Sequence, residues 1–336
     1  MILFYFILFF ILFNLIIYLN HNKLSLLGIP FDNPDEARKL HKKPVLISGG
    51  FILLINILVL LFFLFNFQDT FLKKMFSYQI DIIFFSMIIS FFFLLGIYDD
   101  KKNISPNLKL ILLGMLVYLL IVSNENLMIN EIKLSFLNRS YELGKLSLPF
   151  TILCFLLFIN ALNMFDGMNL QCFSYIFTIF AYFLINQIFF KFLIILFIPL
   201  IIFGYLNYKN RSFIGDSGCY LMSIIIGSLF ITSYNLNEIH SADTIFLLMI
   251  LPGIDMLRLF TVRIINKKNP FKPDRNHIHH KLLNWQGYKK AIIIIILFNT
   301  FILFGVIISI NNLAILIAAL FIYFFLIYLS TRHKTS

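Results

Sequence analysis

Residues 45–67 read VLISGGFILLINILVLLFFLFNF and contain no charged side chain. Because an α-helix rises about 1.5 Å per residue, a run of this length can cross the ~30 Å hydrocarbon core of a membrane. Ten further apolar runs recur along the chain, at 2–19, 80–96, 108–123, 148–163, 170–186, 188–206, 218–233, 244–262, 291–310 and 312–330. They are continuous rather than alternating, which favours helices over the strands of a barrel. The sequence therefore predicts an all-α, polytopic integral membrane protein with about ten or eleven transmembrane helices.

The composition excludes a soluble globular domain. Of the 336 residues, 60% are hydrophobic and 13% are charged, whereas about 25% are charged in a typical soluble domain. Neither an internal repeat nor a long linker interrupts the chain, so we predict one membrane domain over residues 1–336. The first segment, residues 1–19, lacks a basic start and a small-residue cleavage site, which favours a retained helix over a signal peptide. Cys154, Cys172 and Cys219 have no paired spacing and are interpreted as buried thiols.

Most of the 27 lysine and arginine residues lie in the loops that follow the first, third, fifth and later odd-numbered runs. By the positive-inside rule this side faces the cytoplasm, with the N-terminus outside and the C-terminus inside. A net charge of +11 suits a surface next to anionic lipid and would attract an anionic substrate. The basic residues are divided among short loops, so nucleic-acid binding is not expected. We predict a multi-pass protein of the cell inner membrane, in contact with membrane lipids.

Polar side chains gather in the predicted cytoplasmic loops, at about 20–44, 97–108, 160–170, 207–217 and 263–290. The densest stretch, Asn269 to Leu283, reads NPFKPDRNHIHHKLL. Clustering on one face is what a single site served by several helices would show. The longest outer loop, Ser123 to Ser147, could form a small hairpin lid.

Asp99 and Asp100 end the third apolar run and precede two lysines. They could simply mark where a helix leaves the membrane. However, a carboxylate is poorly placed at a helix C-terminus, where the macrodipole is already negative. Adjacent like charges also cost free energy unless they share a cation or a proton. A divalent metal or an acid/base role would account for this pair.

Asn160, Asn163 and Asp166 recur every three residues, so their side chains drift slowly along one helical face. Polar groups at membrane depth are costly and either line a cavity or pair with one another. Hydrogen bonding between helices is the alternative interpretation for the asparagines. The glycine that follows, Gly167, favours a site because it lets a ligand approach the backbone.

The sequence GDSG, residues 215–218, begins the eighth apolar run. Asp216 could be an ordinary N-cap that satisfies the first free amides of a helix. Its flanking glycines suggest a second role, because helix amides beside one carboxylate suit a phosphate with its Mg²⁺.

His277, His279 and His280 lie among basic residues. The spacing of His277 and His280 could form a zinc face, but no cysteine or acid completes a tetrahedral set at a usual spacing. An anion site, in which these histidines and Arg275 donate to phosphate oxygens, fits better. Taken alone, the stretch is equally compatible with a solvated basic loop.

Carboxylates and basic histidines on one face suit phosphoryl transfer, in which positioning and charge neutralisation supply most of the catalysis. A transporter or channel is the competing class, and it would place carboxylates near the middle of the spans. Only Asp81 and Asp255 are candidates for that depth, and Asp255 is interpreted as a structural ion pair with Arg258 at i, i+3. A catalytically silent scaffold is a third alternative.

Four blocks of the sequence also resemble a known family. They are GIYDD (96–100), NALNMFDG (160–167), FIGDSG (213–218) and PGIDMLRLFTVRIINKKNPFKPDRNHIHHKL (252–282). In this order they resemble the signature blocks of the polyprenyl-phosphate N-acetylhexosamine-1-phosphate transferases, glycosyltransferase family 4. The stretch from Arg38 to Gly50 also matches. The HIHH form is similar to the branch of undecaprenyl-phosphate GlcNAc-1-phosphate transferases. The related phospho-N-acetylmuramoyl-pentapeptide transferases tend to carry three consecutive histidines followed by an acid.

The resemblance implies a Mg²⁺-dependent membrane enzyme, with Mn²⁺ as an alternative ion. It would transfer a HexNAc-1-phosphate, most simply GlcNAc-1-phosphate, from a UDP-HexNAc donor to undecaprenyl phosphate and release UMP. This would be the first membrane step of a cell-surface glycan pathway. UDP-MurNAc-pentapeptide or a modified UDP-HexNAc is the alternative donor, and the chain could act as a homodimer.

The resemblance also implies roles for individual residues. They are a Mg²⁺ ligand, Asp216; catalytic Asp99, Asp100 and Asp166, with Asp99 the candidate base; and substrate-binding Asn160, Asn163, Arg275, His277, His279 and His280. Three positions depart from the family pattern. Residues 168–171, MNLQ, stand where a second Asp-Gly is usual, so Asn169 lacks that charge. Cys219 replaces a serine, and residues 46–47, Leu-Ile, replace a Pro-Arg.

Overall fold

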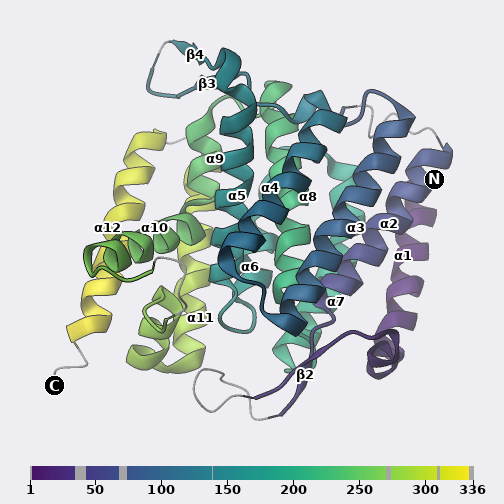
Figure 1. The fold of residues 1–336 in the computed structure, drawn as a ribbon, viewed down its shortest axis with the longest axis horizontal. Coiled ribbons are helices and arrows are strands. Elements are labelled where there is room, and N and C mark those ends of the chain that lie inside the picture. The colour runs from purple at the N-terminus through teal and green to yellow at the C-terminus, as the bar shows by residue number, and fades with distance from the viewer. Residues whose placement is uncertain are drawn as a thin grey trace.

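The computed structural model describes residues 2–34, 43–67, 74–137, 139–269, 274–308 and 311–332. Helices make up nearly all of its regular structure, as the sequence predicts (Figure 1). They are α1 (Ile2–Leu19), α2 (Gly49–Phe67), α3 (Gln79–Lys102), α4 (Pro106–Ser123), α5 (Ser147–Phe165), α6 (Gln171–Ile185), α7 (Phe190–Tyr208), α8 (Gly215–Asn235), α9 (Ala242–Leu248), α10 (Ile250–Ile265), α11 (Ile278–Ile307) and α12 (Asn312–Arg332).

The predicted membrane spans correspond to these helices. In the described part of the chain, eight helices are long and apolar enough to cross a membrane, and there are up to ten if each of two bent helix pairs counts as one span. The predicted run 170–186 forms α6, whose 15 residues are fewer than a full crossing usually needs. The protein is thus a polytopic all-α membrane protein. The three cysteines are free thiols, as predicted.

The predicted run 244–262 is not one straight helix. It breaks into α9 and α10, which are bent by 78° relative to each other. Pro252 lies in the first turn of α10, where the missing N–H has no helical partner to lose, whereas the same ring would interrupt a continuous helix. As a result α10 runs across the direction of α11 and α12 (Figure 1) and carries Asp255 to the histidine stretch.

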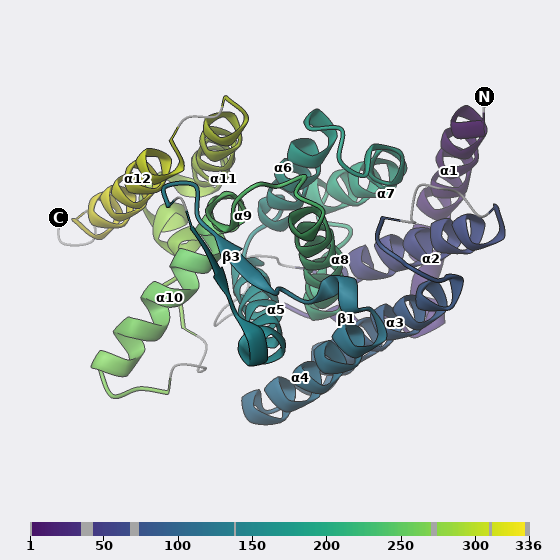
Figure 2. The same ribbon diagram turned by 90° about the horizontal axis from the view of Figure 1, so that it is seen from above.

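α8 lies at the centre of the bundle, with α2, α3 and α5 packed against it (Figure 2). The part of α8 that is long enough to cross a membrane is 100% buried inside the protein, although α8 is the least apolar of the eight spans. Glycines permit the close approach. A Cβ on Gly96 of α3 would lie 2.2 Å from the Cα of Ser217, and one on Gly50 of α2 would lie 2.6 Å from the amide nitrogen of Gly218. Small residues commonly allow such backbone contact between membrane helices. They hold the start of α8 against α2 and α3.

Two short antiparallel strand pairs lie at opposite ends of the bundle (Figure 1). The strands are β1 (Phe31–Asp32), β2 (Val45–Leu46), β3 (Glu131–Lys133) and β4 (Ser140–Glu142). Leu46 also pairs with Ser212, just before α8, so the start of α8 lies at the β1–β2 end. β3 and β4 form the hairpin predicted for the long outer loop. This hairpin lies at the other end of the bundle, where Asp243 accepts hydrogen bonds from the amide and hydroxyl of Ser135. Its role as a lid stays a prediction.

Candidate active site

Asp100, in the last turn of α3, holds the N-terminus of α8. Its carboxylate accepts hydrogen bonds from the backbone amides of Asp216 (2.9 Å) and Ser217 (3.2 Å). The chain enters α8 through Gly215, whose φ is +66°, and a Cβ there would lie 2.8 Å from Oδ2 of Asp100. A carboxylate that is poorly placed at the end of α3 is therefore well placed at the positive end of α8. Asp100 caps a helix that is not its own.

Asp99 is the more deeply buried member of the acidic pair, at 4% exposure. Its carboxylate accepts hydrogen bonds from the hydroxyl of Tyr220 (2.6 Å) and the amide of Ile104 (2.8 Å), and it forms an ion pair with Lys109 (2.7 Å). Both oxygens are thus engaged. A base role for Asp99, which stays a prediction, would require these contacts to break.

Lys109 is a functional candidate that the sequence-based assignment missed. Besides Asp99, its ammonium group lies 3.6 Å from Oδ2 of Asp216 and 5.0 Å from the centre of the Tyr220 ring. It is the single basic residue inside the predicted run 108–123, and only 17% of its side chain is exposed. A buried charge normally requires partners, and this isolation inside an apolar run was the available signal.

Asp216, the predicted metal ligand, lies in the first turn of α8 with 31% of its side chain exposed. Asn163 of α5 donates a hydrogen bond from its amide to Oδ1 of Asp216. Asn160 instead donates to the carbonyl of Leu156 in its own helix, at 2.7 Å. The asparagine series is therefore divided: Asn163 enters the site, whereas Asn160 takes the bond within its helix.

Asp166 follows directly after α5 and is partly buried. Among the described residues, none donates a hydrogen bond to its carboxylate. Burial, together with the negative charges of Asp216, Asp100 and Asp32, raises the pKa of Asp166 to about 8. Asp32, from β1, was also missed by the sequence-based assignment. Asp32, Asp99, Asp100, Asp166 and Asp216 thus lie near one another, and the single positive charge of Lys109 does not neutralise them.

This excess of negative charge fits a divalent cation. Among the described residues, no three histidine, cysteine or acidic side chains form a ready-made metal site. Mg²⁺, however, is usually held by one or two carboxylates and completes its octahedron with water and substrate phosphates. Asp216 and Asp166 are the better candidates, because 31% of the Asp216 side chain is exposed and no described residue donates a hydrogen bond to the Asp166 carboxylate. Asp99 and Asp100 are occupied by backbone amides, Tyr220 and Lys109. These two residues fit the ion.

The histidine stretch joins this site through His279. A Cβ on Gly167 would lie 2.0 Å from Nε2 of His279, so the ring packs on the backbone next to Asp166. The amide of Gln171 lies 3.5 Å from the other ring nitrogen, Nδ1. The His279 ring is also 5.2 Å from that of His277 and 4.3 Å from that of His280, centre to centre. The structure thus brings Asp166 and the three predicted histidines together.

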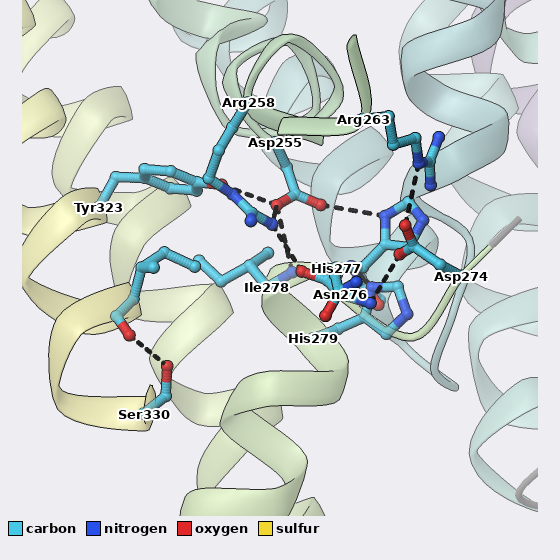
Figure 3. Close-up of polar contacts among 12 residues, drawn as sticks. Asp255, Arg258, Arg263, Asp274, Asn276, His277, Ile278, His279, Tyr323 and Ser330 are labelled. Carbon is cyan, nitrogen blue, oxygen red and sulfur yellow. Dashed lines mark hydrogen bonds and ion pairs between the residues drawn. The ribbon is translucent and has the colours of Figure 1, made fainter. Parts of the chain in front are cut away.

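Asp255 and Arg258 form the predicted ion pair, at 2.7 Å, and they also order the histidine stretch (Figure 3). Asp255 accepts hydrogen bonds from the backbone amide of Ile278 and from Nδ1 of His277, each at 3.1 Å.

A second contact orders the turn before it, where Arg263 donates to Asp274 at 2.9 Å (Figure 3). Partial burial opposes ionisation of Asp274, but the hydrogen bonds from Arg263 and from the amide of Asn276 lower its pKa below the ordinary value. Arg275 is exposed in this turn.

Asn169 does not stand in for the missing carboxylate of the family pattern. Its amide donates to the carbonyl of Asn207 (2.8 Å) and to the side chain of Asn210 (2.6 Å), and its own carbonyl accepts from Tyr288 (3.1 Å). Asn169 therefore stabilises the turn between α7 and α8. The next residue, Leu170, adopts a φ of +65°, a conformation that favours glycine.

Parts of the predicted site lie outside the described residues. They are residues 35–42, with Arg38, Lys39 and His41 of the matching N-terminal block, and residues 270–273 within the predicted loop 263–290.

Several known proteins are similar in sequence to this chain. A model of glycosyl transferase family 4 matches residues 82–234. A probable undecaprenyl-phosphate N-acetylglucosaminyl 1-phosphate transferase of Bacillus subtilis (strain 168) is 27% identical over 70% of this chain and 66% of its own length. A decaprenyl-phosphate N-acetylglucosaminephosphotransferase of Mycolicibacterium smegmatis is 28% identical over 29% of this chain and 27% of its own length. An undecaprenyl-phosphate alpha-N-acetylglucosaminyl 1-phosphate transferase of Yersinia pestis is 24% identical over 56% and 54%.

In each of these three cases the match spans less than two thirds of the relative's length. The region that matches the family model nevertheless contains Asp99, Asp100, Lys109, Asp166 and Asp216. Over these residues, and in the names of these relatives, the chain is similar to glycosyl transferase family 4.

Proposed function

We propose that this protein transfers an N-acetylhexosamine-1-phosphate from a UDP-sugar to undecaprenyl phosphate and releases UMP. One observation carries the proposal: Asp216 and Asp166 converge with Lys109 at the N-terminus of α8. Two accessible carboxylates can hold a divalent cation, while a lysine and helix amides attract phosphate. Such a centre suits phosphoryl transfer between two anionic substrates. The names of the relatives support the same reaction.

In the proposed reaction, an oxygen of the acceptor phosphate forms a bond to the β-phosphorus of the UDP-sugar. The bond from that phosphorus to the bridging oxygen breaks, and UMP leaves with the electron pair. A phosphate monoester with a second pKa of about 6 is already largely ionised at pH 7, so no protein base is required. This agrees with the engagement of both Asp99 oxygens.

We assign the residues of this charged centre different roles. Asp216 and Asp166 would hold Mg²⁺, with Mn²⁺ as the alternative ion. When bound, the ion would offset the negative charge of the diphosphate and of the departing UMP. Lys109 is placed to attract the acceptor phosphate, and Asp100 keeps the first amides of α8 in position. We assign Asp99 to holding Lys109 in place.

The donor would lie between this centre and the histidine stretch. His279 and His280 are within reach of a diphosphate next to Gly167, and Arg275 is exposed beside them. Asn163 is favoured over Asn160 for contact with the nucleotide sugar, since only Asn163 already bonds to Asp216.

GlcNAc-1-phosphate is the proposed group, because each of the three relatives is named for N-acetylglucosamine. UDP-MurNAc-pentapeptide or a modified UDP-HexNAc is the alternative donor. We place the enzyme in the cell inner membrane, with the N-terminus outside and the active site facing the cytoplasm. Exposed Lys101, Lys102 and Lys209 at the ends of α3 and α7 support this orientation. The reaction would open a surface-glycan pathway, and a homodimer stays a prediction.

A transporter is the competing non-enzyme function. It would need carboxylates near the middle of the bilayer. Asp99 and Asp100 instead end α3, Asp216 begins α8 and Asp166 follows α5. Asp255 is already bound by four donors. The arrangement of the described residues therefore favours the enzyme.

The proposal is tested by UMP release. Purified protein in detergent is incubated with undecaprenyl phosphate, Mg²⁺ and, in turn, UDP-GlcNAc, UDP-GalNAc, UDP-MurNAc-pentapeptide and a 6-deoxy UDP-sugar. We expect UMP and the lipid-linked sugar diphosphate in equal amounts from UDP-GlcNAc. A parallel reaction without the lipid separates transfer from hydrolysis. If a folded, monodisperse preparation releases UMP from none of the donors, the proposed function is wrong.

A further inference from the structure

Asp255 lies at the centre of a second polar network, formed by α10, α11 and α12 (Figure 3). Its Oδ1 accepts hydrogen bonds from Nη2 of Arg258 and the hydroxyl of Tyr323, each at 2.7 Å, and from the amide of Ile278 at 3.1 Å. Its Oδ2 faces Nδ1 of His277 at 3.1 Å. With 2% of Asp255 exposed, water cannot replace these partners. These four hydrogen bonds therefore hold the Asp255 carboxylate in one orientation.

This network dictates the protonation pattern of His277. An ionised carboxylate only accepts hydrogen bonds, so Nδ1 of His277 must carry the proton. The other ring nitrogen, Nε2, is then the atom left for a ligand. A ring protonated at both nitrogens can donate Nε2–H to an anion while Nδ1–H stays on Asp255. Asp255 keeps its charge because Arg258 lies beside it.

Tyr323 completes the network from the last helix. Its hydroxyl donates to Oδ1 of Asp255 and accepts from Nε of Arg258, at 2.7 Å in both cases. The residue is fully buried. It therefore fixes the acid and the base relative to each other, although it lies far along the chain from both. Arg258 in turn donates to the carbonyl of Asn276, directly before His277.

The other two histidines lack such a partner. Among the described residues, the only hydrogen bond to His279 comes from the Gln171 amide at 3.5 Å, and no carboxylate lies within hydrogen-bonding distance of His280. The charged and titratable groups around His277 are Asp255 and Arg258 on α10, Tyr323 on α12, His279 and His280 on α11, and Asp274 and Arg275 in the preceding turn. Asp255 therefore distinguishes one histidine of the three.

We propose that Asp255 and Tyr323 are positioning residues, which hold Nδ1–H of His277 on the Asp255 carboxylate and so direct Nε2 toward the nucleotide-sugar donor, where Nε2–H of the doubly protonated ring donates to a phosphate oxygen. The inference deepens the proposed function and rests on it. Neither Asp255 nor Tyr323 would touch the substrate. Helix α12, which lies outside the region that matches the family model, would then contribute to the active site.

The tautomer can be measured without activity. Protein labelled with nitrogen-15 in its histidine rings is studied by NMR, and the His277 signals are assigned from their loss in His277→Gln. We expect a proton on Nδ1 in the unaltered protein, because Nδ1 faces the Asp255 carboxylate. Asp255→Asn places an amide donor or a weaker acceptor at Nδ1 and should increase the Nε2–H form. A neutral Nε2–H form in the unaltered protein would overturn the proposal even if the enzyme is active.

Kinetics provide the second readout. Tyr323→Phe removes one hydrogen bond to a buried charged group, which we expect to reduce kcat/KM for the UDP-sugar by about tenfold. The KM for undecaprenyl phosphate should stay the same. Tyr328→Phe is the matched control, since Tyr328 is an exposed tyrosine of the same helix, whose ring lies 5.3 Å from the Arg332 guanidinium.

The outcomes distinguish positioning from simple packing. An equal rise in the KM values of both substrates would show that Tyr323 only packs α12 and would overturn the proposal. Should Asp255→Asn fail to fold, the NMR spectrum of the unaltered protein and the Tyr323→Phe kinetics decide the question. Absence of any transfer by the unaltered protein would instead overturn the proposed function, leaving the tautomer measurement as an independent result.

Discussion

Asp100 and Asp255 hold helix N-termini in the same way, yet their surroundings differ in charge. Asp100 accepts the first amides of α8, and Asp255 accepts the amide of Ile278 at the start of α11. In both places a carboxylate from another helix lies at the positive end of a macrodipole. Arg258 balances the charge of Asp255. Around Asp100, by contrast, Asp99, Asp166 and Asp216 lie near a single lysine, Lys109.

This difference assigns the two regions different ligands. The first region, which we call the acidic centre (Asp99, Asp100, Asp166 and Asp216), has more negative charge than its own residues neutralise and suits a cation. The second, the histidine region (Asp255, Arg258 and His277), is balanced and leaves a ring nitrogen of His277 for an anion. A metal-bound diphosphate, which is a cation and an anion together, would meet both regions. The following experiments alter one region at a time.

The largest effect is expected from Asp216→Asn, which removes charge from the acidic centre without changing shape. The Mg²⁺-dependent rate should fall by roughly a thousandfold or more, as is common when a group that stabilises transition-state charge is lost. UMP release at several Mg²⁺ concentrations measures it. Asp81→Asn is the control, since Asp81 lies at the other end of α3, where it accepts the amide of Tyr78. An unchanged rate would remove Asp216 from the site.

Lys109→Met should be next in size, because it leaves the buried carboxylate of Asp99 without its cation. Removal of one partner of a buried pair typically costs about 3–5 kcal/mol, and thermal unfolding in detergent should show a correspondingly lower Tm. Adding Asp99→Asn to this variant should recover part of the loss, because the unpaired charge is gone. If the double variant is as unstable as the sum of the two single variants, Lys109 and Asp99 are not coupled.

The effect of pH on stability should be intermediate. The pKa of Asp166 is raised from 3.8 to about 8, so the unfolded chain loses this proton near pH 4 while the folded protein keeps it. Without divalent cations, stability should therefore fall as pH rises from about 4 to about 8, and level off above. The gain in Tm on adding Mg²⁺ should grow over the same range. Asp166→Asn should flatten both trends; if it leaves them unchanged, another group is responsible.

Asn169→Asp should have the smallest effect. The carboxylate would restore the charge of the family pattern but could no longer donate to the carbonyl of Asn207 or to the side chain of Asn210. We expect a Tm lower by a few degrees and a rate within about threefold, in line with the loss of partly exposed hydrogen bonds. A large gain in rate would show that position 169 belongs to the acidic centre after all.

The spans and most of the charged positions could be predicted because lipid imposes strong rules on sequence. A segment such as 49–67 has no alternative to a helix across the membrane, although the first residues of the predicted run, Val45 and Leu46, form β2. Carboxylates such as Asp99 and Asp216 are too costly at a membrane boundary to be placed without a reason. The direction of the Asp99 and Asp100 side chains was not predictable, since it depends on where another helix begins.

Lys109 and Tyr323 show the same limit. Lys109 was recognised only as one basic residue among many, because its two acidic partners come from α3 and α8. Tyr323 is one tyrosine in an apolar helix, and its significance depends on Asp255, which is 68 positions away. Close packing, such as that of Gly96 on Ser217, decides which ends meet.

The sequence alone determined that this chain is a helical membrane protein with its polar motifs at one set of helix ends, since hydropathy and charge act locally along the chain. The tertiary structure decided which of those polar groups are occupied and which are open. Asp99, Asp100 and Asp255 are used to hold other helices, while Asp166, the partly exposed carboxylate of Asp216 and one nitrogen of His277 are the candidates for ligand contact. That division depends on contacts between helices distant in the chain, and short-range patterns carry no information about them.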